Sequence, residues 1–202
     1  MKLYTAPASG NAYKVRLFLS LLGLEHELVP VDIPGGETRS EAFLRINPRG
    51  EIPVLVDGDV TLWDSQAILV YLARRYGGED WLPVSPTEMA QVMGWMSVAQ
   101  NELLFGLARA RAIKRFGRPW NMEQCQEYGI GGLRVLEEHL AHNAWLAVGR
   151  PTIADVACYP YVGLAPEAEI ALEPYGHVLA WMGRVQALPG YAHMDGIAHV
   201  NG

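Results

Sequence analysis

The sequence predicts an α/β domain followed by an all-helical domain. Strand-like and helix-like stretches alternate over residues 1–77, in the order expected for a four-stranded mixed sheet covered by helices. The glycine pair Gly77-Gly78 and the prolines Pro83 and Pro86 mark a linker, and strand patterns disappear beyond it. Residues 87–202 are therefore expected to form a helical bundle.

Local signals define each element of the first domain. Apolar residues recur with helical spacing between Asn11 and Leu22, and Gly23 ends that helix. Two short apolar runs around Asp57-Gly58 predict a hairpin with a tight turn. The expected elements, in order, are a strand over 2–5, a helix over 11–22, a strand over 27–31, a helix over 40–46, a hairpin of strands 54–56 and 60–62, and a helix over 65–76.

The second domain shows four helical stretches. They are expected over residues 87–116, after Asn121, from Thr152 onward, and over residues 175–188. Thr152 is a good N-cap and Asp155 follows three positions later, which is the spacing of a capping box. Asp155 is therefore expected to stabilise the fold and to take no part in an active site.

Composition excludes several classes of function. Of the 202 residues, 50% are hydrophobic and 19% are charged, which favours a folded core over disorder. The net charge of −6, without a basic cluster, argues against nucleic-acid binding. No apolar run is as long as a membrane span, and residues 1–5 resemble a strand rather than a signal peptide. Cys125 and Cys158 have neither zinc-site nor disulfide-scaffold spacing, so we expect a cytoplasmic protein without a metal site.

The stretch from Asn47 to Leu55 is the most informative part of the chain. Ile52 precedes Pro53 at the entry to a strand, which predicts a fixed bend in which the peptide bond could be cis. Such a bend would expose the backbone N–H and C=O of Ile52 to an extended peptide-like ligand. Asp64-Ser65 then opens an apolar helix, where a ligand carboxylate could sit on free N–H groups. Together these features suggest a small peptide ligand.

Four motifs, in this order and spacing, resemble the cytosolic glutathione S-transferase family over nearly the whole chain. The motifs are Ser9-Gly10-Asn11-Ala12-Tyr13-Lys14-Val15-Arg16, Asn47-Pro48-Arg49-Gly50-Glu51-Ile52-Pro53, Asp64-Ser65 and Thr152-Ile153-Ala154-Asp155. The resemblance implies a thioredoxin-like domain over residues 1–77 and a helical domain over residues 87–202. It also implies glutathione as the co-substrate and a homodimer as the assembly.

Two residues could activate the glutathione thiol. A free thiol has a pKa of about 8.5, and lowering it by two units requires roughly 2.7 kcal/mol of thiolate stabilisation. A hydrogen-bond donor beside a helix N-terminus supplies an effect of that size. Ser9 resembles the activating serine of theta-like members, and Asn11 resembles the asparagine of disulfide-reducing bacterial relatives. The sequence carries both, and either could instead cap the first helix.

The resemblance also assigns the binding residues. The Ile52 backbone, held by Pro53, would pair with the cysteinyl part of glutathione. The γ-glutamyl end would be bound by three successive residues, Asp64, Ser65 and Gln66.

The glycyl end has no obvious partner. Glu51 stands where relatives often have a basic residue, and it would repel a carboxylate. Arg39 or Lys14 could supply the missing cation, although charged side chains of this kind are more often solvated on the surface.

A pocket for the second substrate is expected between the two domains. Its walls would be residues 6–8 and the long helix of the second domain, with Phe105, Arg109 and Trp120 as candidates. Arg109 and Arg111 are two positions apart, so at most one of them points inward.

Three functions follow from the resemblance. The first is a detoxifying transferase that conjugates glutathione to hydrophobic electrophiles. The second is a glutathione-dependent disulfide or peroxide reductase, which Asn11 favours. The third is a non-catalytic binding module, which Glu51 favours.

Overall fold

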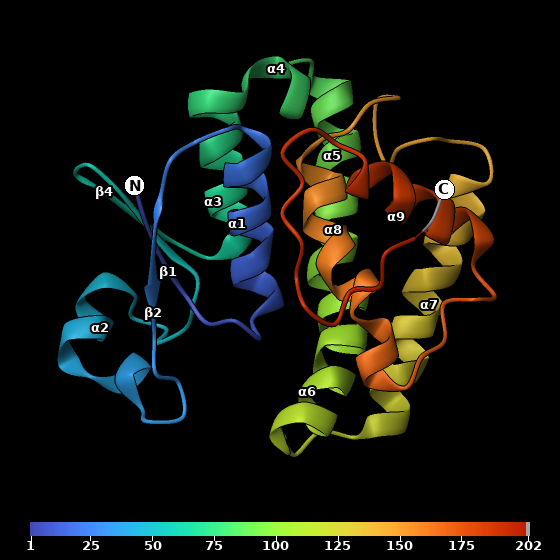
Figure 1. The fold of residues 1–202 in the computed structure, drawn as a ribbon. Helices are drawn as coiled ribbons and strands as arrows, with labels where there is room; N and C mark the ends of the chain where they lie inside the picture. The colour runs from blue at the N-terminus through green and yellow to red at the C-terminus, as the bar shows by residue number, and fades with distance from the viewer. Residues whose placement is uncertain (201–202) are drawn as a thin grey trace.

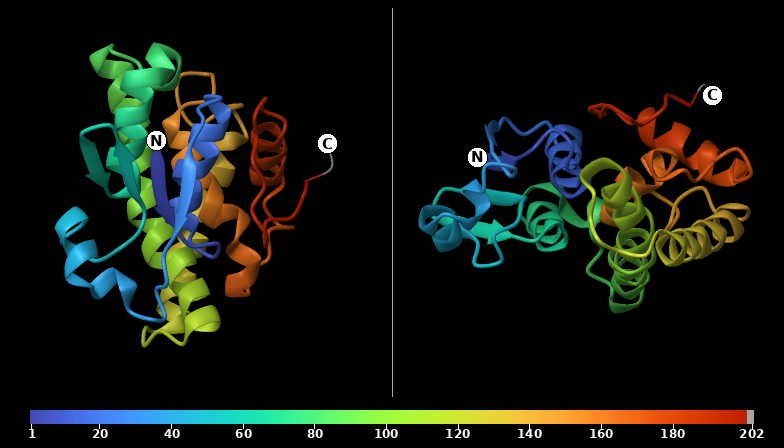
Figure 2. Two further views of the ribbon diagram at one scale, coloured as in Figure 1. Left: turned by 60° about the vertical axis from the view of Figure 1, so that its left-hand side comes forward. Right: turned by 90° about the horizontal axis from the view of Figure 1, so that it is seen from below.

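A computed structural model describes residues 1–200 of the chain (Figure 1). A small mixed sheet lies at one side of the molecule, and a group of long helices forms the other side. Helices α1 (Gly10–Leu21) and α3 (Ser65–Leu72) lie between the sheet and the long helices, as the view from below shows (Figure 2). The expected combination of a thioredoxin-like domain and a helical domain is confirmed.

The sheet has four strands in the order β2-β1-β3-β4. Strand β1 (Lys2–Thr5) pairs in parallel with β2 (Glu27–Pro30) and antiparallel with β3 (Val54–Asp57). Strand β4 (Val60–Trp63) completes the hairpin with β3. The turn itself is one residue later than predicted, because Asp57 still pairs with Val60 and leaves Gly58-Asp59 as the two-residue loop.

The two faces of the sheet are covered differently. Helices α1 and α3 cover the face toward the helical domain, and their apolar residues join its core. Helix α2 (Glu41–Ile46), preceded by the 3-10 turn η1 (Glu37–Arg39), lies at the other face, where Phe43 packs with Val31 and Val54. This second cluster is small, so most of the hydrophobic core lies between the sheet and the helical domain.

The predicted linker at Gly77-Gly78 is wrong. Helix α3 continues as a π-helical turn, η2 (Ala73–Gly77), and a short helix, α4 (Gly78–Trp81), follows directly. Gly78 has a φ of 68°, which lets the chain change direction there without a break. The non-helical connection is confined to residues 82–85.

The helix predicted over residues 87–116 is interrupted. Helix α5 (Pro86–Gln100) ends at Asn101, and a π-helical segment, η3 (Glu102–Ala108), separates it from α6 (Arg109–Phe116). Within η3, Gly106 packs so closely on α7 (Met122–Leu140) that an added Cβ would lie 2.2 Å from the backbone nitrogen of Gly129. The interruption therefore accompanies a close backbone contact between two helices.

Helix α8 (Ile153–Gly163) is the centre of the helical domain, and all of its residues are buried. The expected capping box is present at its start, because Thr152 and Asp155 cap each other. Asp155 also accepts hydrogen bonds from the Leu146 amide at 3.1 Å and the Trp181 indole at 2.9 Å. Complete burial raises the pKa of Asp155 above its usual range, and these hydrogen bonds oppose that rise. The residue is structural, as predicted.

The last elements lead the chain back to the first domain. The 3-10 turn η4 (Ala165–Ala168) and helix α9 (Gly176–Gln186) follow α8, and the chain then runs along α1. Three carbonyls of this segment accept hydrogen bonds from α1: Ala192 from Tyr13 at 2.7 Å, His193 from Arg16 at 2.8 Å and Gly190 from Ser20 at 2.6 Å. Among residues 1–200, each helix is too short or too polar to cross a membrane.

Candidate functional site

The sheet topology brings three connecting segments to one edge. Strand β3 is antiparallel to β1, so residues 52–53 at its start lie beside the loop that follows β1. Strand β4 is antiparallel to β3, so Asp64 at its end arrives at the same edge. The residues singled out in three separate motifs therefore converge at one place, where α1 and α3 also begin.

The Ile52 backbone is available for pairing. The bond between Ile52 and Pro53 is cis. Within residues 1–200, neither the N–H nor the C=O of Ile52 takes part in a hydrogen bond. The preceding loop is held by buried Asn47, whose side chain donates to the Glu51 carbonyl at 2.6 Å and accepts from the Arg49 amide at 3.0 Å. An extended ligand could thus pair with this backbone while Asn47 keeps the loop in shape.

Asp64 caps α3 and leaves Ser65 unused. Its Oδ1 accepts from the amides of Gln66 at 2.9 Å and Ala67 at 3.3 Å, and its φ is 74°. No hydrogen bond of the described chain uses the Ser65 N–H or hydroxyl. The Gln66 and Ala67 N–H groups, which were expected to bind a ligand carboxylate, already donate to the Asp64 cap. The Ser65 N–H and hydroxyl are the donors that remain.

Ser9 and Asn11 lie where α1 begins. Ser9 is the N-cap, and its Oγ accepts from the Ala12 amide at 3.2 Å, so its hydroxyl proton is free to be donated. Asn11 has a buried Oδ1 without a hydrogen-bond partner in the described part of the chain. Gly10 lies between them, and an added Cβ there would be 2.6 Å from the ring of Tyr161. Capping and thiol activation are therefore compatible roles for Ser9.

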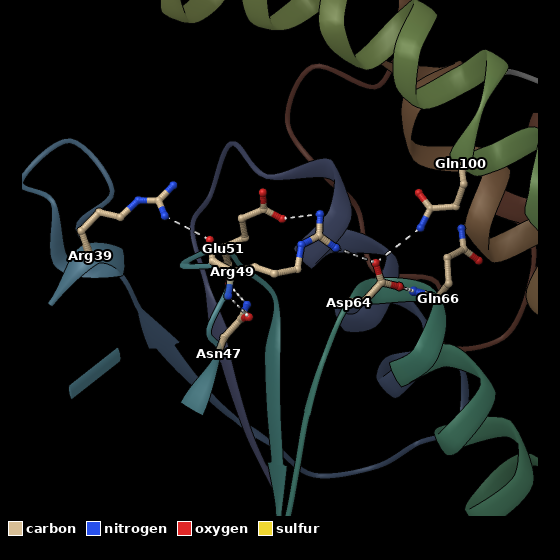
Figure 3. A network of polar contacts seen from close by, with 7 residues as sticks. All are labelled: Arg39, Asn47, Arg49, Glu51, Asp64, Gln66 and Gln100. Carbon is tan, nitrogen blue, oxygen red and sulfur yellow. Dashed lines mark hydrogen bonds and ion pairs between the residues drawn. The ribbon is translucent and has the colours of Figure 1, made fainter. Parts of the chain in front are cut away.

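A network of charged side chains spans the site (Figure 3). Arg49 contacts Glu51 at 3.0 Å and Asp64 at 3.6 Å, and its guanidinium lies 5.9 Å from the centre of the Trp63 ring. On the other side of Asp64, the Gln100 amide of α5 lies 3.5 Å from Oδ2. The sequence reasoning missed Arg49 and Gln100. Arg49 stood within a quoted motif, whereas the sequence contained no signal for Gln100.

The two cations proposed for the glycyl end occupy different environments. Arg39 is exposed and donates to the Arg49 carbonyl at 3.1 Å, beside the Ile52 loop. Lys14 is completely buried in α1, with Nζ 5.0 Å from the centre of the Tyr161 ring. The expectation that Lys14 is a solvated surface charge is wrong, because the residue is completely buried and Tyr161 of α8 lies against it. Both side-chain amide atoms of Gln66 are also buried without a partner within residues 1–200.

Only one of the two arginines on α6 points to the site loop. Arg111 is buried and donates to the Ala8 carbonyl at 2.8 Å, while its Nε pairs with Glu167 at 2.6 Å. Arg109 instead stacks on the rings of Phe105 and Trp120, with centroid distances of 4.1 Å and 4.9 Å. The expectation that at most one points inward is confirmed.

The two cysteines lie in the interior of the helical domain. Both cysteines are free and buried, and burial raises the pKa of each thiol. Over residues 1–200, no group of three or more His, Cys, Asp or Glu side chains is placed to hold a metal ion.

Comparison with known proteins agrees with this geometry. Residues 3–80 match the model of the glutathione S-transferase N-terminal domain, and residues 131–189 match that of the C-terminal domain. The chain is 34% identical to glutathione S-transferase 3 of Zea mays, covering 95% of this chain and 91% of the relative. It is 32% identical to the disulfide-bond oxidoreductase YfcG of Escherichia coli, covering 93% of this chain and 90% of the relative. A crystal structure of a Pseudomonas fluorescens glutathione S-transferase superposes with a TM-score of 0.90 at 38% identity, covering 96% of this chain and 98% of that one.

Proposed function

Because the chain belongs to the glutathione S-transferase family, whose co-substrate is glutathione, we propose that it activates the glutathione thiolate for attack on hydrophobic electrophiles. The observation that carries this proposal is the convergence of three elements at one sheet edge. These are the unpaired backbone of Ile52, the free donors of Ser65 and the hydroxyl of Ser9.

The tripeptide would lie along these three elements in order. The γ-glutamyl carboxylate would accept hydrogen bonds from the N–H and hydroxyl of Ser65, at the positive end of α3. Asp64, which already caps that helix, would take the α-ammonium in place of Arg49. The cysteinyl backbone would pair with Ile52, which places the sulfur toward the start of α1.

Ser9 would then stabilise the thiolate. Its oxygen accepts the Ala12 N–H, which leaves its proton free for the sulfur. A charge-assisted hydrogen bond of this kind contributes about 1.5–3 kcal/mol, or about one to two pKa units. The partial positive charge at the N-terminus of α1 adds to this effect. Asn11 is the alternative donor.

The glycyl carboxylate would be bound by the arginines near Glu51. Arg39 lies beside the Ile52 loop, and Arg49 is freed from Asp64 when the α-ammonium binds. In the free protein Glu51 is paired with Arg49, which reduces the repulsion expected from its charge. The second substrate would lie between the domains, with Phe105, Arg109 and Trp120 as candidate walls of its pocket. The assembly would be a cytoplasmic homodimer.

A disulfide reductase is the second candidate. Asn11 is positioned beside Ser9, and the oxidoreductase of Escherichia coli is a relative over most of both chains. Activity with an aromatic halide and with hydroxyethyl disulfide would distinguish the two reactions. A preference for the disulfide would favour the reductase.

The proposal is tested on bound glutathione. The protein should be retained on a glutathione column, and its bound thiol should titrate about two units below the free thiol. Ser9→Ala should raise that pKa by at least one unit, and Asn11→Ala should change it less. Failure to bind glutathione would refute the proposal and favour a non-catalytic binding module. If Asn11→Ala raised the thiol pKa more than Ser9→Ala, Asn11 would be the activating residue.

A further inference from the structure

Lys14 is an unusual residue for the second turn of a helix. Its side chain is completely buried, although it carries an ammonium group. Within residues 1–200, its Nζ has no hydrogen-bond partner and forms no ion pair. A buried charge is normally paired because leaving water is costly, so an unpaired one requires an explanation.

The ammonium group and the first turn of α1 share one neighbour, the ring of Tyr161. Side chains on a helix lean toward its N-terminus, and Lys14 is three positions after Asn11 on the same face. The ring of Tyr161 contacts both the first turn of α1 and the ammonium group. It packs against Gly10, and Lys14 Nζ lies 5.0 Å from the ring centre. Lys14 therefore places a positive charge behind the turn that carries Ser9 and Asn11.

The groups that face Lys14 do not neutralise it directly. Asp64 acts on it from the start of α3, and Cys158 and Tyr161 act from α8. Burial keeps both of these α8 side chains protonated, because it raises their pKa values. Asp64 is engaged by Arg49 and Gln100 and forms no ion pair with Lys14. Burial lowers the pKa of Lys14 to about 8, so most of the amine is still charged at neutral pH.

We propose that Lys14 is a positioning residue that supplies a buried positive charge favouring the thiolate of bound glutathione over the thiol. The idea rests on the proposed function, since it needs the sulfur to lie at the start of α1. Lys14 would act through the protein interior without touching the sulfur. The Oδ1 of Asn11, in the same turn, is also buried without a hydrogen-bond partner within residues 1–200. In the free protein the Lys14 ammonium has no paired anion, and the thiolate of bound glutathione would supply the opposite charge.

The size of the effect can be worked out from Coulomb's law. Any unit charge about 8–10 Å from a thiolate, at an effective dielectric constant of about 20, shifts the thiol pKa by about one unit. The same charge should matter little to a ligand that has no ionisable sulfur. S-methylglutathione keeps the whole tripeptide but carries a thioether, so it separates the charge effect from a general change of the site.

The test compares Lys14→Met, Lys14→Gln and Lys14→Arg with the wild type. The thiolate of bound glutathione is titrated by its ultraviolet absorbance, and affinity for S-methylglutathione is measured alongside. The Met and Gln variants should raise the bound thiol pKa by about one unit, with S-methylglutathione affinity within twofold of wild type. The Arg variant, which keeps the charge, should restore the wild-type value. Lys114→Met removes an exposed charge of α6 and should change neither quantity.

The outcomes separate this inference from the proposed function. If the wild type does not bind glutathione, the proposed function fails. If it binds but the bound thiol pKa is the same with and without the Lys14 charge, the role of Lys14 is refuted. Equal losses of affinity for glutathione and S-methylglutathione would make Lys14 a purely structural residue and would also refute it. A buried cation replaced by an apolar side chain is often neutral or stabilising, so the Met variant is expected to fold.

Discussion

Arg111 anchors the loop before α1 to the helical domain, and this loop carries Ser9. Its guanidinium donates to the Ala8 carbonyl at 2.8 Å and pairs with Glu167 at 2.6 Å, and its side chain is 5% exposed. Arg115 contacts the same carboxylate at 3.1 Å, but its side chain is 48% exposed. The two arginines therefore offer a matched comparison of a buried and an exposed ion pair on one acceptor.

Replacement of each by methionine should have very different costs. Arg111→Met removes the only guanidinium that reaches both Glu167 and Ala8 within the described structure, and breaking a buried pair typically costs about 3 kcal/mol or more. Arg115→Met breaks an exposed contact, for which about 0–1 kcal/mol is usual. The methionine at position 111 retains part of the apolar stem, so most of the difference should come from the lost polar contacts.

Urea denaturation followed by tryptophan fluorescence would measure both costs. We expect Arg111→Met to lower the free energy of unfolding by at least 2 kcal/mol more than Arg115→Met. The Arg111 variant should also lower kcat, because the loop over residues 6–9 loses its anchor while Arg115 does not touch it. Equal losses of stability in the two variants would show that burial does not determine the strength of these pairs.

Two further predictions concern packing in the helical domain, and both are measured by urea denaturation. Gly106→Ala should destabilise by about 2–3 kcal/mol, since its Cβ would lie 2.2 Å from a backbone atom of Gly129. Gly94→Ala, in α5 with nothing within 4 Å, should instead stabilise by about 0.5–1 kcal/mol, and the opposite signs would disappear if the close contact were absent. Asp155→Ala should cost about 3–5 kcal/mol because it leaves buried donors, among them the Trp181 indole, without an acceptor; a loss below 1 kcal/mol would contradict the hydrogen-bond network.

The local chemistry of the chain was enough to predict most elements of the first domain and its caps. A cap depends on a few consecutive residues, so Thr152 with Asp155, and Asp64 before α3, could be recognised without a structure. The bend at Ile52-Pro53 was signalled in the same way. These signals placed three site segments on the chain, and the resemblance to a known family supplied the ligand.

Contacts between distant residues could not be predicted in this way. The break after α5 accompanies the meeting of Gly106 and Gly129, two residues in different helices. Gln100 reaches Asp64 only because the tertiary fold brings the last residue of α5 near the residue that caps α3. A helical pattern records which residues share a face, but it carries no information about which partner covers that face.

Lys14 shows this division most clearly. The sequence alone predicted that Lys14 lies on α1, one turn after Asn11. A lysine on a helix is usually solvated. Only the tertiary structure placed α8 over it and removed its ammonium from water. The physical reason is that the state of a charge is set by the solvent and the groups around it, which come from elements far away along the chain.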